Sequence, residues 1–209
     1  MQSLIRIIEN LKNSEIKNTI DSRIKEFSEL GKKSINEIFK ELCFCLLTAN
    51  FSAQGGIKIQ KEIGDGFLVL SEIDLAKKLS ELGHRFPNAR AKYILLARKK
   101  INDLKEILKN KNELKKREDL VKEIKGLGMK EASHFLRNIG YKNSAIIDFH
   151  IVDLLVKHDL IEAPKSRSLT PKKYLEIENL LKQIAKKTNL TLGELDLYLW
   201  YEETGKILK

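Results

Sequence analysis

The feature that most restricts the fold of this chain is a helical spacing of apolar residues that recurs from one end to the other. Apolar positions three or four residues apart fall on one face of a helix. Such stripes occupy residues 4–11, 16–27, 75–82 and 120–124. No stretch alternates in the manner of a β-strand, and the run 145–147 is too short to decide. We therefore predict an all-α fold.

Capping residues mark several of the expected helix starts. Ser34 and Glu37 are spaced as a capping box, and so are Thr191 and Glu194. Thr170 precedes a proline, which is favoured in the first turn of a helix. Each of these residues therefore predicts the first turn of a helix, and further helices are expected after Ser71 and Asn88.

The charge balance points to a polyanionic partner. The chain carries 39 Lys and Arg against 29 Asp and Glu, a formal net charge of +10, and nucleic acid is the commonest partner of such proteins. Solubility alone is the competing explanation. No segment is long and apolar enough for a membrane span and no signal peptide is evident, so we expect a cytoplasmic protein.

The two cysteines are expected to be core residues. Cys43 and Cys45 lie in an apolar run and point to different sides of a helix, so they are poor partners for a disulfide or a shared metal. Two cysteines cannot hold a four-cysteine iron–sulfur cluster. No other His, Cys or acidic residues have the spacing of metal ligands, and we expect neither a metal nor a cofactor.

Residues 124–140 carry the pattern of a helix–hairpin–helix, which grips the DNA backbone without reading sequence. One helix is expected to end at Gly126, and Gly128 leads directly into the next. Glycines at such a turn accept backbone conformations that a Cβ disfavours, and they let amides approach a phosphate. The competing interpretation is an ordinary helical hairpin with a solvated basic face.

The second helix of this hairpin is expected to have one buried and one cationic face. The buried stripe consists of Met129, Ala132, Phe135, Leu136 and Ile139. Lys130, His134 and Arg137 are spaced i, i+4 and i+7 on another face, where we predict contacts with DNA.

Lys130 and Asp148 are the candidates for covalent chemistry. A cation is disfavoured in the first turn of a helix, which favours the free, nucleophilic amine of Lys130, whereas nearby DNA phosphates favour the charged form, so the sequence leaves the balance open. The alternative role is a simple phosphate contact. Asp148 follows an apolar approach and precedes a helical stripe. An isolated aspartate there is usually an N-cap, yet a capping carboxylate can keep one oxygen free to stabilise positive charge at the sugar C1′.

These residues resemble the signature of the helix–hairpin–helix base-excision DNA glycosylases, and in particular the archaeal-type, second-class 8-oxoguanine DNA glycosylase/AP lyases. The resemblance spans nearly the whole chain. It is carried by Leu47–Phe51, Gly83–Phe86, Gly126–Asn138, Ile147–Asp148, Tyr198–Tyr201 and the ending Thr204–Lys209.

The resemblance implies two helical lobes with an active cleft between them. We expect one lobe to comprise residues 32–138 and the other residues 1–31 with 139–209. By motif, Lys130 is the Schiff-base lysine and Asp148 the catalytic aspartate of an enzyme that removes 8-oxoguanine and cleaves the strand. The expected partner is damaged double-stranded DNA, bound by a monomer.

The resemblance also points to Lys209, and the chemistry of base extrusion points to three further residues. Lys209 is expected to distinguish 8-oxoguanine from guanine, because a terminal carboxylate accepts a hydrogen bond from N7–H of the lesion alone. Trp200 is expected to stack on the extruded base, and Arg85 and Phe86 to fill the space that it leaves. Core packing of the two aromatic residues and a frayed terminus are the competing interpretations.

Two rival functions remain open. One keeps the fold but changes the lesion to an oxidised pyrimidine or a mismatched base. The other is a non-enzymatic module that anchors a repair complex on DNA, in which Lys130 would contact only phosphates.

Overall fold

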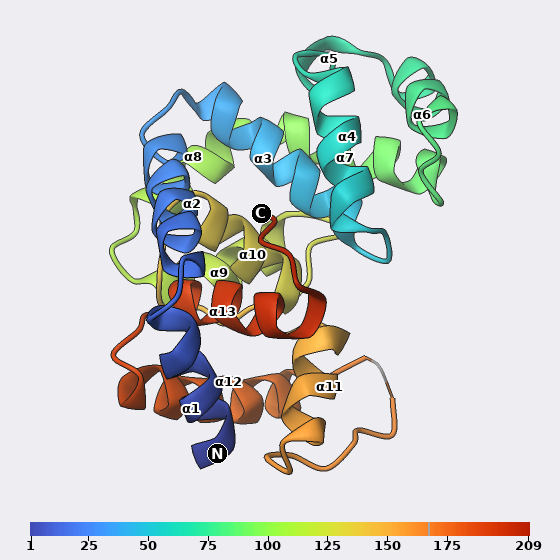
Figure 1. Ribbon diagram of the computed structural model, residues 1–209. Helices are drawn as coiled ribbons and strands as arrows, with labels where there is room; N and C mark the ends of the chain where they lie inside the picture. The colour runs from blue at the N-terminus through green and yellow to red at the C-terminus, as the bar shows by residue number, and fades with distance from the viewer. Residues whose placement is uncertain (167) are drawn as a thin grey trace.

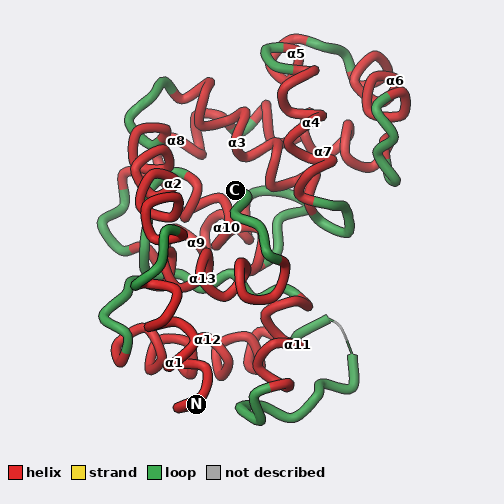
Figure 2. Tube along the Cα trace, viewed as in Figure 1, coloured by secondary structure: helices red, strands yellow, loops and turns green. Residues whose placement is uncertain are grey.

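The computed structural model describes residues 1–166 and 168–209. Within those residues the regular secondary structure is entirely helical, which confirms the predicted all-α class (Figures 1 and 2). The helices, in chain order, are α1 (Gln2–Lys12), α2 (Ile16–Leu30), α3 (Ile35–Thr48), α4 (Ala53–Ile63), α5 (Gly66–Val69), α6 (Glu72–Glu81), α7 (Pro87–Lys99), α8 (Ile101–Lys109), α9 (Glu113–Glu123), α10 (Met129–Asn138), α11 (Phe149–Lys157), α12 (Pro171–Lys187) and α13 (Leu192–Thr204).

The predicted capping residues begin their helices. The side chains of Ser34, Thr170 and Thr191 each accept a hydrogen bond from the amide three residues further on. Only Thr191 forms the reciprocal capping box among them, because Glu194 Oε2 also accepts from the Thr191 amide at 2.7 Å. The helix expected after Asn88 begins one residue before it, at Pro87.

The helix–hairpin–helix joins α9 to α10 through residues 124–128. The first helix ends at Glu123, three residues before the predicted end at Gly126. Gly126 has a φ of +91°, and a Cβ there would also collide with the ring of Tyr93. Gly128 has a φ of −95°, which any residue adopts. The conformational need for glycine is therefore confirmed at Gly126 and is wrong at Gly128.

Apolar side chains gather in three clusters. The largest is built from helices α3 to α10 and includes both cysteines, which are fully buried, free thiols as predicted. The second joins α1, α11, α12 and α13 with the segment that precedes α11. A small third cluster, formed by Ile20, Phe27, Leu197 and Tyr198, packs α2 against α13.

The chain passes from the second cluster (α1) to the largest (α3 to α10) and then returns to the second (α11 to α13). It begins in α1 at the outer end of the second cluster, and its last residues return to the middle of the molecule, near α3 and α10 (Figure 1). Among the described residues no helix has the length and apolar character that crossing a membrane requires.

Candidate active site

Lys130 lies in the first turn of α10, directly after the hairpin. Its side chain is 22% exposed, and Nζ lies 3.8 Å from Glu131 Oε1. Glu131 in turn accepts a hydrogen bond from the Gly128 amide at 3.3 Å, which satisfies one of the free donors at the start of the helix. The amine of Lys130 is thus partly buried but still accessible to a ligand.

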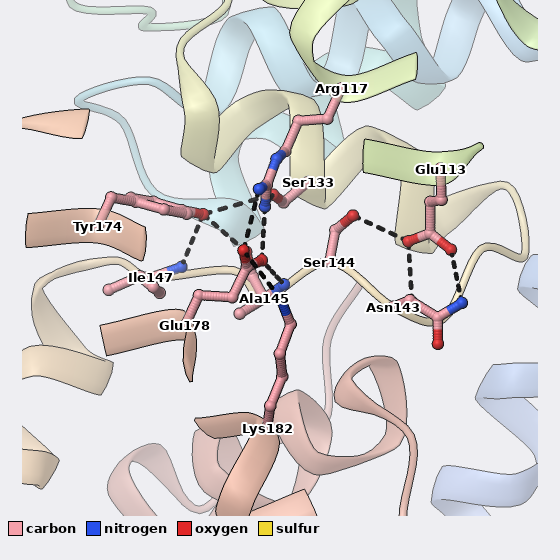
Figure 3. Close-up of polar contacts among 10 residues, drawn as sticks. All are labelled: Glu113, Arg117, Ser133, Asn143, Ser144, Ala145, Ile147, Tyr174, Glu178 and Lys182. Carbon is pink, nitrogen blue, oxygen red and sulfur yellow. Dashed lines mark hydrogen bonds and ion pairs between the residues drawn. The ribbon is translucent and has the colours of Figure 1, made fainter. Parts of the chain in front are cut away.

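The segment that leads to Asp148 is held by side chains from distant parts of the chain (Figure 3). Residues 144–147 are buried and have no regular structure. Glu178 of α12 accepts from the Ala145 amide at 2.9 Å. Tyr174 Oη donates to the Ala145 carbonyl at 2.6 Å and lies 3.4 Å from the Ile147 amide nitrogen. The backbone just before Asp148 is therefore held by α12 through the Ala145 amide and carbonyl and the Ile147 amide.

The same network reaches the helix that carries Lys130 (Figure 3). Tyr174 Oη lies 3.4 Å from Ser133 Oγ of α10. Arg117 of α9 makes a bidentate pair with Glu178, at 2.5 and 2.9 Å, and its Nη1 lies 3.3 Å from Ser133 Oγ. These buried contacts connect the supports of Lys130 and Asp148 through one set of hydrogen bonds.

Asp148 caps α11 as predicted. Its Oδ1 accepts from the Ile151 amide at 3.0 Å, and the side chain is only partly buried. A capping carboxylate uses one oxygen for the helix. Its other oxygen is not committed to this bond and can face a ligand.

Asp196 of α13 brings a further carboxylate to the site. It is 9% exposed and lies 3.6 Å from Nη1 of Arg137. Burial raises the pKa of Asp196 to about 6; the charge of Asp148 also raises it, while Arg137 and Lys130 lower it. The charges of Lys130, Asp148, Arg137 and Asp196 thus act on one another.

His134 is buried, and its ring nitrogens make no hydrogen bond of good geometry among the described residues. The residue is 6% exposed, and the Lys209 backbone oxygen lies near enough to favour the protonated ring. Its ring meets Phe44 edge-to-face at 5.6 Å between centroids. Burial, with the charges of Arg137 and Lys130, lowers the pKa of His134 well below its usual range, so the imidazole is neutral at pH 7.

The predicted cationic face of α10 is wrong in one respect. His134 and Arg137 are 6% and 5% exposed, so neither lies on a solvated surface. Phe44 of α3 covers His134, and the Arg137 guanidinium lies over the Phe27 ring at 4.6 Å beside Asp196. Only Lys130 of the three is accessible.

Trp200 lies close to the start of α11. Its ring meets that of His150 edge-on at 4.9 Å between centroids. The indole nitrogen is buried without a partner in the part of the chain that the structure describes. Since His150 follows Asp148 by two residues, Trp200 flanks the candidate site from α13.

Arg85 and Phe86 lie on a loop that is anchored to the protein by the buried side chain of His84. Nε2 of His84 lies 3.0 Å from the Leu47 carbonyl, and its Nδ1 accepts from the Phe86 amide at 3.0 Å. Phe86 is 39% exposed, with the Arg85 guanidinium 5.2 Å from its ring centroid. The loop thus presents an aromatic and a cationic side chain at the surface.

Lys209 is not frayed. Its Nζ lies 2.8 Å from Oε2 of Glu41, and it also contacts Gln60 Oε1. Glu41 and Asp196 were not predicted as site residues. Asp196 stands between two leucines in a helix, and that pattern was an available signal; Glu41 directly follows Lys40, and its sequence neighbours gave none.

No group of three or more His, Cys, Asp and Glu side chains suited to a metal ion occurs within residues 1–166 and 168–209. The arrangement therefore offers an accessible amine, partly and fully buried carboxylates, and aromatic rings around one region. Amine and carboxylate together suit nucleophilic attack at a carbon that gains positive charge.

Comparison with known proteins identifies relatives of this chain. A family model described as 8-oxoguanine DNA glycosylase matches residues 20–190. An 8-oxoguanine DNA glycosylase/AP lyase from Methanocaldococcus jannaschii is 58% identical over 99% of both chains. One from Korarchaeum cryptofilum is 53% identical over 100% of this chain and 99% of its own.

Solved structures agree with these matches. The M. jannaschii 8-oxoguanine glycosylase/lyase, crystallised with a 15mer DNA containing 8-oxoguanine, superposes with a TM-score of 0.95 at 57% identity, over 99% of this chain and 100% of its own. The Thermotoga maritima 8-oxoguanine DNA glycosylase superposes with a TM-score of 0.93 at 44% identity, over 100% and 99%.

Proposed function

Because this chain belongs to the 8-oxoguanine DNA glycosylase family, we infer that it removes 8-oxoguanine from DNA and cleaves the strand at the resulting abasic site. It is a bifunctional DNA glycosylase and abasic-site lyase of base-excision repair, and its partner is damaged double-stranded DNA. The observation that carries the assignment of chemistry is the shared support of Lys130 and Asp148: one buried hydrogen-bond network contacts both their elements.

Lys130 is proposed as the nucleophile. Its Nζ, as the free amine, attacks C1′ of the extruded nucleotide, and the bond from C1′ to the base breaks with its electron pair leaving on the base. The amine loses a proton and the sugar ring opens to give an imine. Loss of a proton from C2′ then expels the 3′ phosphate by β-elimination, and water releases the lysine.

Asp148 is proposed as the carboxylate that stabilises positive charge at C1′. Breaking the glycosidic bond gives the sugar oxocarbenium character, which a nearby carboxylate lowers in energy. Its hydrogen bond to the Ile151 amide holds the side chain in place while the second oxygen remains available.

The remaining residues divide between the base and the duplex. We propose that Lys209 reads the oxidised base and Trp200 stacks on it. Gly126 and Gly128 bring backbone amides to a phosphate, and Arg85 and Phe86 occupy the space left by the extruded nucleotide. His134 and Arg137, expected on the DNA-facing surface, are assigned instead to shaping the site from within, since both are buried.

The domain boundaries 32–138 and 1–31 with 139–209 are retained as a proposal. The largest apolar cluster lies within residues 38–139 and the second within residues 4–8 and 145–199, which supports this division. We further propose that the protein acts as a monomer on the nucleoid in the cytoplasm; size-exclusion chromatography tests the oligomeric state.

Borohydride trapping on a duplex with one 8-oxoguanine tests the mechanism. Borohydride reduces the imine to a stable amine, so the unaltered protein is expected to become covalently linked to DNA. Lys130→Gln should abolish the adduct. Asp148→Asn should retain DNA binding and lose base removal.

Other outcomes separate the rival functions. An adduct on an oxidised-pyrimidine or mismatched duplex, without one on 8-oxoguanine, would assign a different lesion. Binding to any duplex with no adduct on any lesion would support the anchoring module. A Lys130→Gln variant that still forms the adduct would show that another lysine is the nucleophile.

A further inference from the structure

The side chain of the last residue, Lys209, is held inside the largest helical cluster. Its Nζ contacts the carboxylate of Glu41 on α3 at 2.8 Å and the Gln60 side-chain oxygen on α4. The Lys209 side chain is 20% exposed, whereas that of Glu41 is 2% exposed. A buried carboxylate is strongly disfavoured unless it is paired. Glu41 therefore favours the bound position of the C-terminus.

Glu41 is the centre of a polar cluster that is complete only with this lysine. Asn138 of α10 donates to Oε1 of Glu41 at 2.6 Å, and Gln60 Nε2 donates to Oε2 at 3.0 Å. Gln60 Nε2 also donates to the Lys40 carbonyl at 3.0 Å, which directs its oxygen toward Lys209. The amide groups of Asn138 and Gln60 satisfy part of the hydrogen-bonding capacity of the Glu41 carboxylate, and Lys209 supplies the positive charge that balances it.

This placement brings the end of the chain beside the helix of the proposed nucleophile. Nζ of Lys209 lies 4.4 Å from the centroid of the Phe44 ring, and His134 packs edge-on against the same ring. The Lys209 backbone oxygen favours protonation of His134, although burial outweighs it and lowers the pKa of His134. Since His134 lies one helical turn beyond Lys130, this contact places the backbone end of the chain about one turn of α10 from the proposed nucleophile.

We propose that Glu41, supported by Gln60 and Asn138, positions the terminal carboxylate of Lys209 and thereby sets the preference for 8-oxoguanine over guanine. The proposal rests on the proposed function. Glu41 touches neither the base nor the reacting atoms, so it is a positioning residue. Glu41 pairs with the side-chain amine of Lys209, so the terminal carboxylate of Lys209 is not part of this ion pair.

The chemistry of the two bases makes this position decisive. N7 of 8-oxoguanine carries a hydrogen and donates to a carboxylate, whereas N7 of guanine is an acceptor and is repelled by one. A shift of about 1 Å in such a group can lower a rate by about 100-fold. Cleavage of a preformed abasic site involves no base, so it does not need the Glu41–Lys209 pair.

Comparing two substrates tests the proposal. Glu41→Gln retains the size of the side chain and removes its charge. Single-turnover removal of 8-oxoguanine is expected to fall by about 10- to 100-fold, while cleavage of a duplex with a preformed abasic site stays within about twofold. Glu106→Gln, which removes the charge of an exposed ion pair with Lys109, is the matched control and should change neither rate.

A second variant shows whether Glu41 acts through Lys209. In a chain that ends at residue 208, the carboxylate lies on a different residue and the ion pair is gone. Glu41→Gln should then cause no further loss of 8-oxoguanine removal. A merely structural role would instead lower both activities in both backgrounds.

Three results would overturn the proposal. One is an unchanged rate of 8-oxoguanine removal in Glu41→Gln while the unaltered protein is active. Another is an equal loss of removal and abasic-site cleavage, and the third is a multiplicative loss when both changes are combined. If the unaltered protein cleaves abasic sites but never removes 8-oxoguanine, the proposed substrate itself is wrong and the positioning role falls with it.

Discussion

Asp196 is a buried carboxylate whose pKa is affected by the other charged groups of the candidate site. Burial raises its pKa from 3.8 to about 6, and Asp148 adds to the increase against the opposing effects of Arg137 and Lys130. Between these two values the folded chain binds a proton that the unfolded chain has released. The stability contributed by this proton is complete below about pH 4 and is lost as the pH rises through about 6.

Asp196→Asn removes this titration. The free energy of unfolding of the unaltered protein is expected to fall, relative to the variant, by on the order of 3 kcal/mol between about pH 4 and pH 7. Urea unfolding at several pH values measures the difference. Asp153→Asn, on the exposed side of α11, is the control. A difference between protein and variant that stays constant with pH would contradict the raised pKa.

The local settings of Lys130 and Asp148 were predictable because each is marked by a local motif: a helix start after a hairpin, and a capping aspartate after an apolar run. What covers His134 and Arg137 was not. Helical spacing places both on one face, but Phe44 and Asp196, which cover that face, belong to helices far away in the sequence.

At the scale of elements, Tyr174 joins the helix of Lys130 to the segment before Asp148. Its hydroxyl contacts Ser133, the Ala145 carbonyl and the Ile147 amide. One oxygen atom therefore restrains the two elements that carry the proposed nucleophile and its carboxylate. Losing it should change their relative position more than it changes the binding of DNA.

Tyr174→Phe removes only this oxygen. We expect kcat for 8-oxoguanine removal to fall by about 10-fold or more, because small displacements of reacting groups are costly, while KM and the affinity for DNA change little. Steady-state kinetics and a binding titration measure the two effects. Tyr141→Phe, which loses a single 3.4 Å hydrogen bond to the Leu108 carbonyl, is the control. A loss confined to KM would argue against a positioning role.

The helices themselves were largely predictable, and the reason is local. Ser34, Thr170 and Thr191 cap their helices from within the same few residues. Residues 144–147 behave differently. Their conformation depends on Tyr174 and Glu178, about 30 residues away, so a window of neighbouring residues contains no information about it.

At the scale of the whole molecule, the Arg117–Glu178 pair connects the two large apolar clusters. Arg117 extends from α9, which packs in the first cluster, and Glu178 extends from α12 in the second. Their side chains are 3% and 1% exposed. Burial raises the pKa of Glu178, but Arg117 and the Ala145 amide outweigh it and hold that pKa below its usual value. The pair thus stays charged inside the protein.

The pairing of these clusters was not predictable from the sequence. Composition and periodicity indicate how many helices form and which faces are apolar, and the expected lobes came from the resemblance rather than from periodicity. A buried Arg and a buried Glu separated by 61 positions look like ordinary solvated charges in a basic chain. Only the folded structure shows that they neutralise each other.

Removing one member of this pair leaves the other buried and unpaired. Arg117→Met and Glu178→Gln are each expected to lower the free energy of unfolding by about 3–5 kcal/mol. The double variant should lose less than the sum of the two, because neither residue then leaves a charge uncompensated. Urea unfolding gives all four values of this cycle.

A Lys182 variant is the control that distinguishes loss of the buried pair from loss of an exposed charge near Glu178. Lys182 lies 3.6 Å from Glu178 but is 41% exposed, so Lys182→Met should cost no more than about 1 kcal/mol. If the two losses at Arg117 and Glu178 simply added, the pair would be stabilising each cluster separately. If the double variant loses well under the sum of the two single losses in free energy of unfolding, the pair connects the two clusters. The reason is that the penalty arises only when one member is charged and its partner is absent.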